Sequence, residues 1–275
     1  MLGKLIKYDL KFMNRYLIII HGFFLLVSIA IRLFLTGPLF SAGTDFENTK
    51  IMLPLALFAI IYIMVITAAA FATAAVITVR FYKNLFSNQG YLTHTLPVTS
   101  GQHLLSKTIS GSIWAILNIL LTAASLWIVV ATPFITDAWS ANLPAIREEL
   151  GFTGAYAGMS WGTVIAIVMA MMLFGSVSSV ITYYASIVIG QLIPNHKILG
   201  AVAAYFVITT VASIITLIFL AVTGLFGASI SPSQSFAGIS YFINTAVLSG
   251  GLSLVFGVIL YIASYWIMKK RINLD

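Results

Sequence analysis

The chain has 275 residues, of which 60% are hydrophobic and only 8% are charged, and its formal net charge is +7. A soluble domain of this length needs a far more charged surface, so much of this surface must face lipid. Cysteine is absent, which excludes disulfides, thiolate metal sites and cysteine nucleophiles.

Apolar runs long enough to cross a bilayer recur along the whole chain. A helix rises 1.5 Å per residue, so about 20 residues cover the roughly 30 Å of hydrocarbon. We expect an all-α polytopic membrane protein, with residues 1–275 in one transmembrane domain. The six predicted spans are residues 16–35, 51–79, 109–135, 161–190, 199–226 and 241–268. The second and fourth are longer than one crossing needs, which predicts tilt or continuation into water.

The segment before the first span is amphipathic, with apolar residues at helical spacing and lysines on the opposite side. This pattern predicts an interfacial helix that leads into the first span. A cleaved signal peptide is the alternative, but no small-residue cleavage site follows the long apolar run, which favours an uncleaved anchor. The apolar positions are Leu2, Leu5, Ile6, Leu10 and Met13, and the lysines are Lys4, Lys7 and Lys11.

Charge is distributed unequally between the two predicted faces of the membrane. Six spans put both termini on one side, and that side collects most of the basic residues: Lys4, Lys7, Lys11, Arg15, Arg80, Lys83, Lys107, Lys197, Lys269, Lys270 and Arg271. The opposite side carries Asp45, Glu47, Asp137, Glu148 and Glu149, with Arg32, Lys50 and Arg147 as its bases. The positive-inside bias then predicts cytoplasmic termini. Because the membrane accounts for the basic charge, we expect no nucleic-acid partner.

Ionisable residues are nearly absent from the predicted spans. No acidic residue lies between Glu47 and Asp137, or between Glu149 and Asp275. Ion-coupled transporters use such groups at membrane depth, so that class is disfavoured. His21 and Arg32, near opposite ends of the first span, are expected to extend their polar ends toward the headgroups.

The sequence offers no set of residues typical of an enzyme. There is no phosphate-binding G-x-x-x-x-G-K-[ST] motif, so the chain is not expected to hydrolyse ATP. His94, His103 and His196 lack the spacing and carboxylate neighbours of a zinc site, and we expect them to be ordinary solvated histidines on the cytoplasmic side. We therefore expect no catalytic residue, metal or cofactor on this chain.

Hydroxyl-bearing and small residues form stripes on the later spans. One interpretation is helix–helix contact, because small residues permit close approach and hydroxyls bond across helices. The other is a weakly polar lining along which an amphiphilic molecule could move. The stripes comprise Asn118, Thr122 and Ser125; Ser178, Thr182 and Ser186; Thr209, Ser213 and Thr216; and Thr245, Ser249 and Ser253.

The connection between the second and third spans is polar and has defined ends. Helical spacing continues through residues 80–87, Gly90 is suited to ending that helix in a left-handed conformation, and Pro97 disfavours helix at the residue before it. Thr99 and Gln102 have the spacing of a capping box that opens the next helix. Tyr91, Leu92 and Leu96 would be exposed on this connection unless the chain's own helices, the lipid interface or a docking partner covers them.

Residues 80–114, "RFYKNLFSNQGYLTHTLPVTSGQHLLSKTISGSIW", resemble the corresponding segment of ATP-binding-cassette type 2 permeases of Gram-positive bacteria. In that family a "GYL-T-TLP" core is followed by a polar turn and an "LL-SK" start to the next helix. The matching positions here are Gly90, Tyr91, Leu92, Thr93, Thr95, Leu96 and Pro97, then Leu104, Leu105, Ser106 and Lys107. The amphipathic start, six spans and cytoplasmic termini also match the family architecture.

The resemblance implies the permease subunit of an exporter in the cell membrane, with ATP and Mg on a separate ATPase subunit. It implies that Gly90 to Pro97 hold a short coupling helix that docks on the ATPase, and that a second permease chain, identical or different, completes the transporter. The expected substrate is an amphiphile such as a peptide, a lipid-like molecule or a drug. Residues 224–238 are where the family would place a re-entrant pair. The alternative is an accessory, immunity or regulatory membrane subunit with no conduit of its own.

Overall fold

The computed structural model describes residues 2–37, 49–87, 89–90, 97–152, 156–193, 195–225 and 238–270. Long helices make up this part of the chain, as the sequence predicts. They are α1 (Leu2–Leu35), α2 (Thr49–Phe86), α4 (Ser100–Val130), α5 (Pro133–Glu149), α6 (Trp161–Gly190), α7 (Lys197–Val222) and α9 (Gly238–Lys270).

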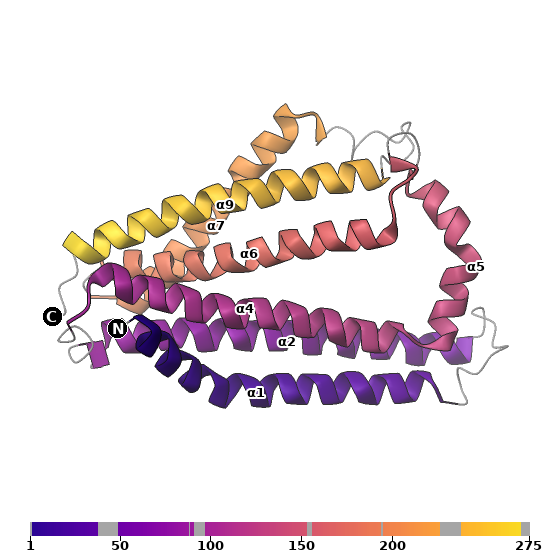
Figure 1. Ribbon diagram of the computed structural model, residues 1–275, viewed down its shortest axis with the longest axis horizontal. Coiled ribbons are helices and arrows are strands. Elements are labelled where there is room, and N and C mark those ends of the chain that lie inside the picture. The colour runs from indigo at the N-terminus through magenta and orange to yellow at the C-terminus, as the bar shows by residue number, and fades with distance from the viewer. Residues whose placement is uncertain are drawn as a thin grey trace.

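Six of these helices are long and apolar enough to cross a membrane, namely all but α5. The protein is therefore a polytopic all-α membrane protein, as predicted. The start of α1 and the end of α9 lie at the same end of the bundle (Figure 1). We call this the basic end, because the starts of α1, α4 and α7 and the ends of α2 and α9 bring together Lys4, Lys7, Lys11, Arg15, Arg80, Lys83, Lys107, Lys197, Lys269 and Lys270.

The membrane-length helices pack as two groups. One contains α1, α2 and α4, and the other contains α6, α7 and α9. The largest buried cluster joins them near the basic end, where the ring of Phe81 on α2 stacks on Tyr184 of α6 at 3.9 Å between centroids. Gly111 of α4 lies against the same tyrosine, since a Cβ built there would be 2.5 Å from Tyr184 Oη. A side chain at this position would push α4 and α6 apart.

Much of the outer surface is apolar, as a lipid environment requires. On α7 only Gly200 is buried, and Phe206, Val211 and Ile218 are 63%, 48% and 54% exposed. A soluble protein would not leave such a face uncovered, whereas hydrocarbon covers it without cost.

The sequence did not predict α5, which occupies a region expected to be an external loop. The third span was predicted to run to Ile135, but α4 ends at Val130. Pro133 explains the break: its ring clashes with the preceding helical turn and disfavours helix at Thr132, which is extended at φ −105° and ψ 147°. Proline suits a first helical position, so the chain restarts as α5 and crosses the end of the bundle opposite the basic end (Figure 1).

The C-terminal end of α5 is fixed to the starts of α6 and α9. Arg147 donates to the carbonyls of Ala157 and Met159 and lies 4.5 Å from the Phe152 ring centroid. Phe152 in turn packs with Val164 and Ile239 in a small buried cluster. These contacts make α5 an ordered part of the bundle.

The predicted amphipathic segment is helical, but it is continuous with the first span in α1. Its lysines are exposed as expected. Its apolar side does not rest on lipid alone, because Met13 belongs to the large buried cluster and Leu10 packs against it. The predicted fourth span coincides with α6, and the sixth lies within α9.

Candidate functional site

The connection between α2 and α4 carries the residues expected to couple the chain to an ATPase. Tyr91, Leu92, Thr93, Thr95 and Leu96 lie outside the described residues, as does His94, whereas Gly90 and Pro97 are described. The second span does continue as predicted, since α2 runs to Phe86. Gly90 does not end it: α2 stops four residues earlier, and Gln89 and Gly90 are again helical.

The start of α4 has the predicted capping box. The Thr99 side chain accepts from the backbone N–H of Gln102, and the Gln102 side chain accepts from the backbone N–H of Thr99. This reciprocal pair satisfies donors that the first turn would otherwise leave unbonded. It fixes the residue at which the connection ends and α4 begins.

Within two turns of the end of α2 and of the start of α4, a buried ion cluster unites these two helices with α1. Lys107 Nζ donates to both carboxylate oxygens of Asp9 at 2.6 Å, and Arg80 Nε donates to Asp9 Oδ1 at 3.2 Å. The side chains of Asp9 and Lys107 are only 3% and 4% exposed, and that of Arg80 is 16% exposed. We call these three residues the ion cluster.

Aromatic side chains surround the ion cluster. The Arg80 guanidinium lies 4.3 Å from the ring centroid of Phe12, and Tyr184 Oη donates to the backbone carbonyl of Lys107 at 3.2 Å. The cluster therefore touches α6 as well as the three helices that supply it. Breaking a buried pair leaves an uncompensated charge, so separating α1, α2 and α4 at this cluster would be costly.

A second polar contact lies deeper along α1. His21 was expected to extend toward the headgroups, but it is 3% exposed and packed between helices. Its Nδ1 donates to the Leu17 carbonyl at 2.8 Å, and its Nε2 lies 3.1 Å from Asn118 Oδ1 on α4. Thr73 Oγ1 on α2 also lies 3.4 Å from that amide oxygen. A polar partner on the facing helix removes the need for His21 to reach water.

The positions of His103, His196 and Arg32 agree only in part with those predicted from the sequence. His103 was expected to be solvated, but it is 1% exposed in the first turn of α4, whereas His196 is exposed as predicted. Arg32 lies at the end opposite the basic end and donates to the Ile128 carbonyl at 2.8 Å. No group of three or more His, Asp or Glu side chains that could hold a metal comes together in the described residues.

Two residues of the hydroxyl stripes, Ser125 and Ser178, meet a neighbouring helix. Ser125 bonds to Tyr62 of α2 at 2.8 Å, and Ser178 of α6 faces Gly257 of α9. Several hydroxyls donate to carbonyls of their own helix, which hides their polarity from the surroundings. Those self-bonded residues are Thr122, Thr182, Ser186, Thr209, Thr216, Ser249 and Ser253. Ser213 is exposed on α7, and Thr245 Oγ1 is buried without a hydrogen-bond partner among the described residues.

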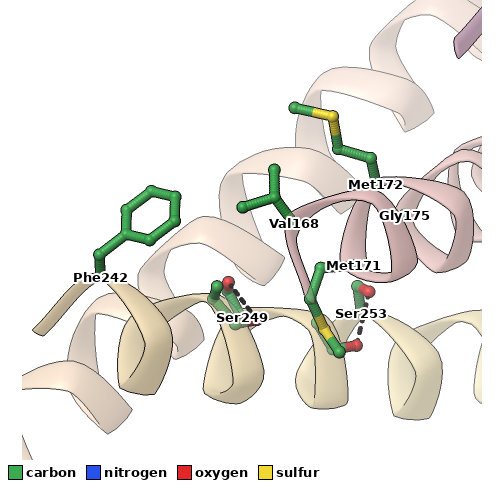
Figure 2. A pocket seen from close by; sticks show the side chains of 9 residues that line it. Val168, Met171, Met172, Gly175, Phe242, Ser249 and Ser253 are labelled. Atoms are coloured by element: carbon green, nitrogen blue, oxygen red, sulfur yellow. Dashed lines mark hydrogen bonds between the residues drawn. The ribbon is translucent and has the colours of Figure 1, made fainter. Parts of the chain in front are cut away.

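An open apolar groove of about 350 Å³ lies between α6 and α9. Figure 2 shows Met171 extending from α6 toward α9, and Ser249 and Ser253 bonded back along α9. A Cβ built on Gly250 would lie 2.5 Å from Met171 Sδ, so this glycine permits the methionine to pack there. Of the hydroxyl stripes offered as a conduit lining, Ser249 and Ser253 line this groove.

Sequence reasoning missed Asp9, which supplies the only negative charge of the ion cluster. A signal was present, because Asp9 lies on the apolar side of an amphipathic helix beside Leu5, Ile6 and Met13. A carboxylate in that position needs a buried cation, and Arg80 and Lys107 were its candidates at the same end of the bundle.

Comparisons of the chain with protein-family models, with curated proteins and with solved structures gave no match.

Proposed function

We propose that this chain is the membrane-spanning permease subunit of an ATP-binding-cassette exporter. In this proposal it moves an amphiphilic substrate out of the cytoplasm and depends on a separate ATPase subunit, which binds ATP and Mg. The similarity of residues 80–114 to type 2 permeases supports the proposal. So does the architecture of the described part: it has six membrane-length helices, and the start of α1, the end of α9 and most of the basic residues lie at one end of the bundle.

The observation that carries the proposal is the length of α2 and α4, the two helices that the connection joins. With 38 residues, α2 is about 57 Å long, and α4, with 31 residues, is about 46 Å long. Both exceed the roughly 30 Å of hydrocarbon by far more than modest tilt requires. Their excess at the basic end would present the connection between them to a soluble partner.

The ion cluster supplies a physical route from that connection into the bundle. Lys107 is in the second turn of α4, and Arg80 is in the last two turns of α2, so both ends of the connection are tied to Asp9 on α1. A force applied to the connection would move these three helices together. This is the mechanical property that an ATPase-driven permease needs.

The proposal also covers the orientation of the chain, the membrane that holds it and its partner chain. The positive-inside bias supports a cytoplasmic basic end, and the resemblance supports the cell membrane of a Gram-positive bacterium. A second permease chain, identical or different, would complete the transporter. The exposed apolar faces of α7 and of the groove between α6 and α9 are surfaces on which lipid or that second chain would pack.

Co-purification with a candidate ATPase, such as one encoded beside this chain, tests the proposal. Leu96→Asp with Pro97→Ala changes the connection and is expected to abolish ATPase binding, or its stimulation, without loss of membrane insertion. The chain offers a matched control, because Leu143 and Pro144 form the same dipeptide on α5 at the opposite end. Leu143→Asp with Pro144→Ala should leave ATPase binding unchanged.

Two results would count against the proposal. Unchanged binding and stimulation in the Leu96 and Pro97 double variant would remove the connection from any coupling role. Assembly with an ATPase but no transport-linked change in ATP hydrolysis would favour the alternative, an accessory, immunity or regulatory subunit.

A further inference from the structure

The ion cluster is not electrically balanced. It contains two cations, Arg80 and Lys107, and one carboxylate, Asp9. Lys107 directs its ammonium at both oxygens of that carboxylate at 2.6 Å, so the tightest pairing is between Asp9 and Lys107. The surplus positive charge therefore falls mainly on Arg80, which is also the most exposed of the three.

The Arg80 guanidinium is held in place, but only part of its hydrogen-bonding capacity is used. Its Nε bonds to Asp9, and its Cζ lies over the Phe12 ring, 4.3 Å from the ring centroid. Among the described residues, no acceptor bonds its two terminal nitrogens. A guanidinium fixed in this way presents a rigid fork of donors whose geometry matches the oxygens of a phosphate group.

The side chains near Arg80 indicate that it lies at the depth of the membrane–water interface. Tyr8, Phe12 and Tyr16 recur every four residues on one face of α1 and are 64%, 37% and 45% exposed. Exposed aromatic side chains of this kind gather where the headgroups meet the hydrocarbon. Toward the bilayer centre the same face continues with Ile19 and Phe23, which are 71% and 66% exposed.

We propose that Arg80 and this aromatic strip form a binding site for an anionic phospholipid, with the phosphate of the headgroup on the terminal nitrogens of Arg80. An acyl chain then lies along Ile19 and Phe23. The surplus charge of the ion cluster attracts the headgroup, and the exposed Lys7, Lys11 and Lys83 add to the local positive potential. The site is independent of the transport proposal, because it needs only the membrane and the described helices.

The test is lipid titration of the purified full-length protein in neutral detergent, with bound lipid counted by native mass spectrometry. Phosphatidylglycerol should bind, and phosphatidylcholine should bind far more weakly. Arg80→Gln should weaken phosphatidylglycerol binding at least about tenfold, because a charge-assisted hydrogen bond is lost with the charge. The matched control Lys83→Gln removes an exposed charge from the same helix and should cost at most about fivefold, the contribution of one surface cation.

Arg80→Gln leaves the Asp9 and Lys107 pair intact, so it should elute as a folded monodisperse protein. If it does not, Arg80→Lys keeps the charge but lacks the planar fork, and weaker phosphatidylglycerol binding by that variant supports the site. Three outcomes would overturn the proposal: equal losses in Arg80→Gln and Lys83→Gln, displacement of the lipid by inorganic phosphate at equal concentration, or loss of ATPase binding in Arg80→Gln with lipid affinity unchanged.

Discussion

Asp9→Asn removes the only carboxylate of the ion cluster while keeping the shape of the side chain. Lys107 is 4% exposed and would lose both of its 2.6 Å hydrogen bonds to a charged acceptor. Arg80 would lose its 3.2 Å bond at the same time. Two cations would then share a poorly solvated space without a counter-ion.

The expected cost follows from comparing the single and double variants. Removing one partner of a buried pair costs about 3–5 kcal/mol, because the other charge stays buried. Asp9→Asn leaves two cations without a carboxylate partner, so its cost in stability should lie at the upper end of that range. Lys107→Met leaves Asp9 paired with Arg80, so it belongs at or below the lower end. The double variant, Asp9→Asn with Lys107→Met, retains Arg80 as the only charge of the cluster. Because the Arg80 side chain is 16% exposed and can contact solvent, the double variant should be more stable than Asp9→Asn alone.

The assay is reversible unfolding of the purified protein in mixed micelles, with the free energy of unfolding measured for all four members of the cycle. A double variant more stable than Asp9→Asn corresponds to a strong coupling energy between the two positions. If the two single costs add in the double variant, the pair makes no specific contribution, and the role assigned to the ion cluster is refuted. The exposed Lys7→Met serves as a control and should change stability by about 0.5 kcal/mol or less.

Two further substitutions test packing elsewhere in the bundle. Asn118→Leu should destabilise the protein by about 1–2 kcal/mol, because His21 loses its partner on α4 at 3.1 Å. Asn244 is exposed, so Asn244→Leu is the control. Equal losses of stability in the two variants would contradict the bond between His21 and Asn118. Gly111→Ala should cost about 1–3 kcal/mol, because its Cβ would lie 2.5 Å from Tyr184 Oη and 2.9 Å from Val180 Cγ1. Gly251→Ala meets nothing within 4 Å and should be neutral or stabilising by up to about 1 kcal/mol, so thermal unfolding of the two alanine variants should separate them.

The parts of the fold that depend on local patterns were predictable. Each span is a long apolar run, and hydrocarbon permits few structures other than helix for such a run. The Thr99 and Gln102 capping box and the continuation of α2 to Phe86 depend on residues close in sequence, and both were predicted correctly. The α5 helix was missed because its residues are much less apolar than those of the spans, although Pro133 marked both the end of α4 and a favourable helix start.

The polar contacts between helices were not predictable, because they depend on which faces meet. His21 and Asn118 are 97 residues apart, and Asp9 and Lys107 are 98 apart. An isolated His21 should extend toward the headgroups, and only a polar side chain at the right height on α4 changes that outcome. His103 is buried for the same kind of reason, since nothing near it in the sequence specifies what packs over the start of α4.

The position of Gly111 has a mechanical consequence. The close approach of α4 to Tyr184 of α6 at Gly111 lies about 17 Å from the start of α4 at Ser100 and about 29 Å from its end at Val130. The two helix axes diverge from there toward α5 (Figure 1). A rigid α4 that pivots on this contact acts as an unequal lever, and its far end travels about 1.7 times as far as the end beside the connection. Small displacements at the basic end would therefore emerge enlarged at the opposite side of the membrane.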